Sequence, residues 1–238
     1  MSAVAPVPPL LAVAHGTRDA AGMAAIGALL ARVRALRPWL PVHLGCVDVA
    51  RPSLEEALAA LSGEVVLVPL LLGEGHHVRV DIPRALATAP RVRALPCPAL
   101  GPDPLLAEAL AGRLAEAEGR GAGDGPVVLA AAGSTRPAAN AATAAMAGLL
   151  SARLGRPAVA AYLCGGSPTP AEAVARLRDA GHPSVTVAPY LLGPGFFARQ
   201  AAGAGGSVTS EPLGAHEAVA RLVLRRYDGA VGLRSVAA

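Results

Sequence analysis

Histidines follow two apolar stretches of this chain, and imidazole is the side chain best suited to bind a transition metal or accept a proton at neutral pH. Residues 10–14 are apolar and are followed by His15, and residues 65–72 are followed by a short turn with His76 and His77. Apolar stretches of this length are typical of buried strands. Because ligands of open α/β sheets bind beyond the carboxyl ends of the strands, we expect His15 and His77 at one site.

A carboxylate is expected at the same edge, because Asp48 lies at the end of a third apolar stretch. Two imidazoles and a carboxylate form a ligand set for a first-row divalent metal. We therefore predict His15, His77 and Asp48 as metal ligands, and His15 and His77 also as catalytic groups. Glu74 and His76 lie in the same turn as His77, and the sequence leaves open whether either joins the site.

The elements that position these side chains alternate along the chain. Apolar stretches of strand length are separated by Ala- and Leu-rich stretches of helical period, which predicts an α/β fold with a parallel sheet covered on both faces. Ser53 and Glu56 form the pattern of a helix capping box. The strands expected in the first half are residues 10–14, 42–48, 64–71 and 92–95, and the helices are residues 20–36, 53–61, 78–88 and 103–118.

The second half of the chain repeats the first. Three segments recur in the same order at nearly constant spacing: residues 127–134 match 10–17, residues 168–174 match 52–58, and residues 188–199 match 68–79. Repeats of this kind indicate homologous structural units. We therefore expect two α/β halves, residues 1–120 and 121–238, joined by a glycine-rich linker at 119–126.

The two halves differ at the positions that could carry chemistry. The polar side chains of the first half are replaced one by one: His15 by Ala132, Asp48 by Cys164 and His77 by Phe197. The turn glycines Gly16 and Gly75 keep their counterparts. A purely structural role for the histidines would predict similar residues in both halves, so the difference indicates one functional site, in the first half.

The amino-acid composition is typical of a globular protein and argues against several functional classes. Hydrophobic residues make up 53% of the chain, which is enough for a large core, whereas aromatic residues make up 3%. All 21 basic residues are arginine. They are scattered without aromatic neighbours, which argues against nucleic-acid binding despite the net charge of +4. The three widely spaced cysteines are typical of a reducing compartment, and we expect a cytoplasmic protein without a signal peptide, membrane span or other membrane association.

Two segments resemble the class II chelatases of the CbiX and SirB type. Residues 14–19, Ala-His-Gly-Thr-Arg-Asp, are similar to the opening motif of that family. Residues 69–83 are similar to its second signature, in which a histidine lies four residues before Asp-Ile-Pro, so that His77 rather than His76 matches. Asp48 occupies the position of a family acidic residue that is more often Glu. The resemblance covers nearly the whole chain, because the long form of the family is itself a duplicated chelatase half.

The resemblance implies a lyase that inserts ferrous iron or cobalt into sirohydrochlorin, a tetrapyrrole, on the way to siroheme or cobalamin. The metal is then a substrate, and no organic cofactor is expected. It also implies two similar flavodoxin-like parallel-sheet domains with a cleft between them. A duplicated chain can form this cleft as a monomer.

The peripheral carboxylates and the flat ring of such a substrate suggest further binding residues. Four arginines near the predicted site, Arg18, Arg51, Arg79 and Arg84, could each bind a carboxylate through two hydrogen bonds. Phe196 and Phe197, in the corresponding turn of the second half, could pack against the ring. Two other classes compete: a non-catalytic carrier of divalent metal, and a hydrolase or isomerase with His15 as base, which the absence of a Gly-x-Ser-x-Gly motif disfavours.

Overall fold

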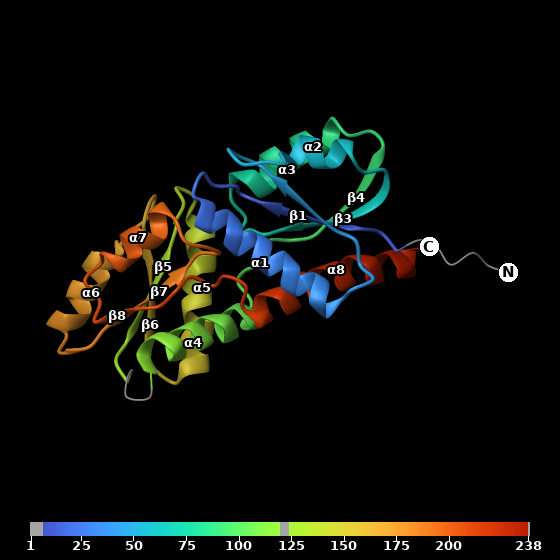
Figure 1. The fold of residues 1–238 in the computed structure, drawn as a ribbon. Helices are drawn as coiled ribbons and strands as arrows, with labels where there is room; N and C mark the ends of the chain where they lie inside the picture. The colour runs from blue at the N-terminus through green and yellow to red at the C-terminus, as the bar shows by residue number, and fades with distance from the viewer. Residues whose placement is uncertain (1–6, 120–123, 238) are drawn as a thin grey trace.

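The computed structural model describes residues 7–119 and 124–237, which form two α/β lobes (Figure 1). Each lobe contains a four-stranded parallel sheet, and the strand orders are β2-β1-β3-β4 and β6-β5-β7-β8. This arrangement confirms the predicted fold class. The predicted linker is described only at its two ends, because residues 120–123 lie outside the described residues.

The elements of the first half follow the order expected from the sequence. They are β1 (Leu10–Ala14), α1 (Ala20–Leu36), β2 (Val42–Cys46), α2 (Leu54–Ala59), β3 (Gly63–Pro69), the π-helix η1 (His77–Asp81), α3 (Ile82–Ala87), β4 (Val92–Pro96) and α4 (Pro104–Glu118). The capping box at the start of α2 is present, with reciprocal hydrogen bonds between Ser53 and Glu56.

The second half repeats the same succession. It comprises β5 (Val127–Ala131), α5 (Pro137–Leu154), β6 (Ala158–Tyr162), α6 (Pro170–Asp179), β7 (Thr186–Tyr190), α7 (Phe196–Ala202), β8 (Val208–Thr209) and α8 (Glu217–Ala237). Backbone hydrogen bonds confirm the register of the repeat. The N–H of Asp48 donates to the carbonyl of His15 at 2.9 Å, and that of Cys164 donates to the carbonyl of Ala132 at 2.8 Å.

Several elements of the first half differ by one to three residues from the sequence-based bounds, and three of these differences affect the site. The second strand ends at Cys46, because the chain turns at Val49, which has a φ of +34°. Asp48 is therefore in a loop and not at a strand end. The third strand ends at Pro69 and not at residue 71. The expected helix over 78–88 begins one residue earlier, as a π-helix at His77.

The sheets bury side chains on both faces, and the faces belong to different cores. On β1, Leu10, Ala12 and Ala14 enter a core that is shared by both lobes, whereas Leu11 and Val13 pack under α2 and α3. Strand β5 alternates in the same way. Burying a leucine or valine contributes about 1.5–3 kcal/mol, so the shared core couples the stability of the two lobes.

The last helix of each half covers the sheet of the other half. Helix α8 packs on β3 and β4, and α4 packs on β7 and β8. The hydroxyl of Tyr227 on α8 donates to the carbonyl of Pro8 at 2.7 Å. Glu118 on α4 pairs with Arg156 at 2.6 Å and accepts a hydrogen bond from Thr186 at 2.8 Å. The sequence halves are thus interlocked through their C-terminal helices.

None of the helices within residues 7–119 and 124–237 is long and apolar enough to span a membrane.

Candidate active site

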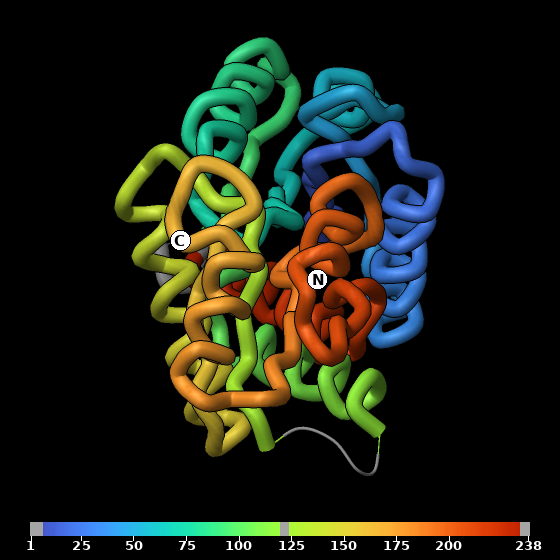
Figure 2. The backbone as a smooth tube through the Cα atoms, turned by 90° about the vertical axis from the view of Figure 1, so that its left-hand side faces the viewer, coloured from blue at the N-terminus to red at the C-terminus, as the bar shows by residue number. Residues whose placement is uncertain are grey.

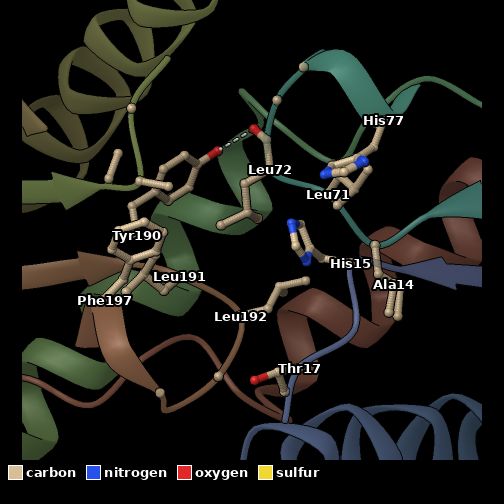
Figure 3. A pocket seen from close by; sticks show the side chains of 18 of the residues that line it. Ala14, His15, Thr17, Leu71, Leu72, His77, Tyr190, Leu191, Leu192 and Phe197 are labelled. Carbon is tan, nitrogen blue, oxygen red and sulfur yellow. Dashed lines mark hydrogen bonds between the residues drawn. The ribbon is translucent and has the colours of Figure 1, made fainter. Parts of the chain in front are cut away.

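Strand pairing brings the two predicted histidines together. Strands β1 and β3 are neighbours, with Val13 opposite Pro69, and His15 and His77 follow their carboxyl ends. The ring centroids of His15 and His77 are 4.5 Å apart, with an interplanar angle of 86°. Figure 3 shows both rings at the edge of one cavity. The turn after His15 requires glycine, because a Cβ on Gly16 would lie 2.1 Å from the backbone oxygen of Asp48.

Hydrogen bonds fix which nitrogen of each ring is available to a ligand. His15 Nδ1 lies 3.0 Å from the carbonyl oxygen of Gly16, and His77 Nδ1 lies 2.6 Å from Oδ2 of Asp81. The Gly16 carbonyl and the ionised Asp81 carboxylate can only accept, so in each neutral ring Nδ1 donates and Nε2 keeps its lone pair. Metal-binding histidines are held in this way by a carbonyl or a carboxylate.

The π-helix η1 sets the position of Asp81 relative to His77. The N–H of Ile82 bonds to the carbonyl of His77, five residues before it in the chain. Such π-turns are rare and are frequently found at functional sites. His76 precedes the π-helix, is exposed, and lies 3.8 Å from the other carboxylate oxygen of Asp81. Asp81 therefore faces both histidines of the turn.

The histidine pair opens onto a cavity of about 640 Å³ between the lobes. Most of the side chains that line it are apolar, and many of them are small. The residues of the first lobe are 14–17, Gly22, Ile26, 70–73 and 75–77, and those of the second lobe are 131–134, Ala139, Asn140, Thr143, Cys164 and 190–198. The cavity thus joins the histidine edge of the first sheet to the corresponding edge of the second, which has no histidine.

The structure gathers some of the predicted site residues and not others. His15, His76, His77, Phe196 and Phe197 line the cavity. The rings of Phe196 and Phe197 are 5.6 Å apart, and Phe196 is 64% exposed at the wall of the cavity.

Asp48 and Glu74 do not line the cavity, and both are exposed. The carboxylate of Asp48 instead accepts a hydrogen bond from the N–H of Val49 at 2.9 Å. Over the described part of the chain, no three His, Cys, Asp or Glu side chains are close enough to hold one metal ion. The structure therefore brings the side chains of His15 and His77 together, whereas Asp48, in the β2–α2 loop, lies outside the cavity wall.

The four predicted arginines are exposed and lie outside the cavity wall. Arg51 pairs with Glu56 at 2.6 Å. Arg18, Arg79 and Arg84 make no hydrogen bond or ion pair with any described residue.

Two contacts across the lobes were not foreseen from the sequence. The hydroxyl of Tyr190 donates to the carbonyl of Leu72 at 3.1 Å, at the cavity wall (Figure 3). Burial raises the pKa of Tyr190 well above its usual range, so this donor stays protonated. Arg199 binds Asp19 at 3.0 Å, and its hydrogen bond lowers the pKa of the Asp19 carboxyl. Of the residues that sequence reasoning missed, only Asp81 had a local signal, its spacing of four from His77.

Comparisons with known proteins agree with this geometry. The CbiX family model matches the chain twice, over residues 9–117 and 126–230. A protein of Methanococcoides burtonii named sirohydrochlorin cobaltochelatase is 28% identical over 85 residues, which is 34% of this chain. The aligned part spans 65% of that relative's length.

Solved structures with the same fold cover almost the entire chain. SirB from Bacillus subtilis, solved with Fe³⁺, has a TM-score of 0.77 at 23% identity and covers 94% of this chain and 95% of its own. CbiX, described as the terminal enzyme for biosynthesis of siroheme in denitrifying bacteria, has a TM-score of 0.67 at 26% identity and covers 93% and 98%. The double match of the family model coincides with the two structural repeats, and the chain therefore belongs to the CbiX family.

Proposed function

We propose that this protein is a chelatase that inserts ferrous iron or cobalt into sirohydrochlorin. The observation that carries the proposal is the pair of free Nε2 atoms of His15 and His77 at one edge of an apolar cavity between two lobes. Membership of the CbiX family and the name of the Methanococcoides relative support the choice of substrate.

In the proposed reaction, His15 and His77 bind the metal ion. Neutral imidazole is a good ligand for both iron and cobalt. With only two ligands from the protein, the ion keeps other coordination positions open. Open positions are required because the ion must be transferred to the nitrogens of the macrocycle. The Asp81 carboxylate behind His77 offsets the positive charge of whatever binds at Nε2.

The remaining cavity receives the macrocycle. Its wall is formed by Leu71, Leu72, Leu191 and Leu192 and by the exposed ring of Phe196, and such surfaces pack well against a flat conjugated ring. A ring lying there presents one face to the histidines. Its peripheral carboxylates are then partners for the exposed guanidinium groups of Arg18, Arg79 and Arg84, which make no hydrogen bond or ion pair with any described residue.

The proton balance gives the histidines a second task. Two N–H groups of the macrocycle lose their protons as one divalent ion enters, so two protons must leave the site for each metal inserted. As the ion passes from the two histidines to the ring nitrogens, each Nε2 is released and can accept one of these two protons near neutral pH.

The assay is metal insertion followed by the absorption spectrum of the macrocycle. Protein, sirohydrochlorin and cobalt or ferrous ion are mixed without oxygen, and the rate is compared with spontaneous insertion. We expect acceleration by the native protein and a loss of about 100-fold or more in His15→Ala and His77→Ala. His43→Ala, which removes an exposed histidine on β2 outside the cavity wall, is the matched control and should retain the native rate.

Two other outcomes of this assay would reject the proposal. Tight metal binding without acceleration would identify a metal carrier instead. Native rates in both cavity variants would exclude the histidine pair as the site.

We further propose that the enzyme acts as a cytoplasmic monomer, without nucleic-acid or membrane partners. The cavity is supplied by two lobes of one chain, so a second copy is not needed to form it. All three cysteines, Cys46, Cys97 and Cys164, are free, as expected in a reducing compartment. Light scattering at micromolar concentration tests the oligomeric state, and a stable dimer would contradict it.

A further inference from the structure

The two lobes face each other on both sides of the cavity. We call these two borders seams: the first lies between α1 and α7, the second between η1 and α5, and the first is closed. There the start of α1 packs against the turn between β7 and α7. Asp19, the N-cap of α1, binds Arg199 of α7 at 3.0 Å. A Cβ on Gly22 would lie 2.9 Å from the carbonyl oxygen of Pro194, and one on Gly193 would lie 3.4 Å from that of Gly22. The backbone of α1 and the backbone of the β7–α7 turn are therefore in direct contact along this seam.

The internal repeat identifies the corresponding residues of the second seam. The counterparts of Gly193, Arg199 and Asp19 are Gly73, Arg79 and Arg136. Figure 2 shows α1 and α7 on one side of the molecule, and α5 with α3 on the other. A Cβ on Gly73 would meet no atom within 4 Å. The backbone-to-backbone approach of the first seam is therefore absent at Gly73 itself, although the hydroxyl of Tyr190 reaches the carbonyl of the preceding residue, Leu72.

The second seam also lacks the pair of opposite charges that joins the first. Where the first seam has an aspartate at the start of α1, the second has Arg136 at the start of α5. Arg79 and Arg136 are both exposed, and neither guanidinium bonds to any residue in the described ranges. The nearest acidic residue to Arg79 in sequence, Asp81, is bonded to His77, and Glu74 in the preceding turn is exposed. The ion pair that joins the first seam therefore has no counterpart between Arg79 and Arg136, whose charges are alike.

The second seam leads directly into the cavity. Ala139 and Asn140, in the first turn of α5, line the cavity from the second lobe. Gly75 and His76 line it from the first lobe, just before the helical turn that carries Arg79. A ligand that passes between Arg79 and Arg136 therefore arrives beside the histidine pair.

We propose that the second seam is the entrance of the cavity, and that Arg79 and Arg136 together bind a peripheral carboxylate of the incoming macrocycle. The proposal rests on the proposed function, because it takes the substrate to be a tetrapyrrole polycarboxylate. Guanidinium groups bind carboxylates through paired, charge-assisted hydrogen bonds, and a positive entrance accelerates the association of a polyanion. At the first seam the backbone contacts of Gly22, Gly193 and Pro194 leave no such passage.

The test separates KM for sirohydrochlorin from kcat in the cobalt-insertion assay. Arg136→Gln should raise KM about five-fold, and Arg79→Gln should do the same, with kcat within two-fold of native. Arg136→Asp introduces the residue type of the closed seam, which can pair with Arg79, and should raise KM about 20-fold. Increasing salt should raise the native KM toward that of Arg136→Gln, whose own KM should depend less on salt.

Two arginines serve as matched controls. Arg153→Gln makes the same change in net charge further along α5, at a residue outside the cavity wall. Arg199→Gln removes the counterpart of Arg79 at the closed seam. Both should keep the native KM. Melting temperature and cobalt binding without macrocycle are measured for every variant, since a folded protein with an intact histidine pair retains both.

The outcomes distinguish this inference from the proposed function. If the native protein does not accelerate insertion, the proposed function fails. If it does, but KM is native in folded Arg136→Gln and Arg136→Asp, the entrance is refuted. An equal rise of KM in Arg153→Gln would show that overall charge is responsible, which would also refute it.

Discussion

At the residue scale, the histidine pair depends on the acceptors behind it. His15 is held by a backbone carbonyl, which no substitution can remove, whereas His77 is held by the side chain of Asp81. A metal-binding histidine loses its orientation and some of its basicity when such a partner is removed. Asp81 is therefore a positioning residue whose contribution can be measured separately from that of the ligands.

Replacing Asp81 should weaken metal binding without removing a ligand. We expect Asp81→Ala to lower the affinity for cobalt by about 10–100-fold, measured by calorimetry without macrocycle. Asp81→Asn keeps an acceptor oxygen and should lose less. Glu74→Ala removes an exposed carboxylate from the neighbouring turn and should keep native affinity. Equal affinities for Asp81→Ala and the native protein would rule out the positioning role.

The three thiols should differ in reactivity. Burial raises the pKa of Cys97 to about 11, and it also raises the pKa of Cys46, because both thiolates would be poorly hydrated. Cys164 is exposed in the cavity wall. We expect an aromatic disulfide reagent near neutral pH to modify one thiol in the native protein and three after unfolding. The rapid phase should disappear in Cys164→Ser, and a second rapid thiol would contradict the burial of the other two.

At the element scale, helix α8 begins with a cap that depends on pH. Nδ1 of His216 accepts a hydrogen bond from the N–H of Ala218 at 3.2 Å, which requires the neutral ring. The pKa of His216 lies below its usual value, first because the ring is buried and then because Arg113 repels the cation. Acidification therefore acts on the same helix that joins the two lobes.

The sign of the effect on stability follows from proton binding. Below about pH 6.5 the unfolded chain binds a proton at His216 that the folded protein does not bind. The contribution of His216 to the free energy of unfolding is therefore complete above that pH. It declines as the pH falls, until the folded ring is protonated as well.

His216→Asn should remove this pH dependence and keep the helix cap, because asparagine is a good N-cap residue. Thermal unfolding of both proteins at about pH 7.5 and about pH 5.5 measures the difference. The native protein should lose more stability between the two pH values than His216→Asn. An equal or smaller loss in the native protein would exclude His216 as the titrating group.

At the scale of the whole molecule, the exchanged helices make the two lobes one cooperative unit. The shared core contains residues of β1, β3, β5 and β7 as well as α1, α4, α5 and α8. We therefore expect a single unfolding transition in guanidinium, with the same midpoint by circular dichroism and by fluorescence. Two separated transitions would show that the lobes are independent.

Glu118 reports on this coupling, because its pair with Arg156 is nearly buried and joins α4 to the second lobe. Glu118→Ala leaves the guanidinium without its partner and should cost about 3–5 kcal/mol. Glu116→Ala, on the same helix but in an exposed pair with Arg113, should cost about 1 kcal/mol or less. Hydrogen exchange should quicken in both lobes of Glu118→Ala, and an effect confined to the second lobe would contradict the coupling.

Several features of the molecule could be predicted from short stretches of sequence. Helix α1 spans the predicted residues 20–36, and the capping box at Ser53 forms as expected. Such features depend on hydrophobic period and on local hydrogen bonds, which neighbouring residues carry. The meeting of His15 and His77 was also predictable, because parallel strands place their carboxyl ends at one edge of a sheet.

The sequence by itself thus determined the elements, the duplication and the identity of the two imidazoles, since each depends on residue type and spacing. The tertiary structure alone decided that Asp48 lies outside the cavity wall, that Asp81 holds His77, that the C-terminal helices exchange lobes and that backbones approach closely at Gly193 but not at Gly73. These features arise from contacts between residues up to more than 200 positions apart, such as Tyr227 and Pro8. Contacts of that kind depend on how complete lobes pack, and a local pattern does not encode them.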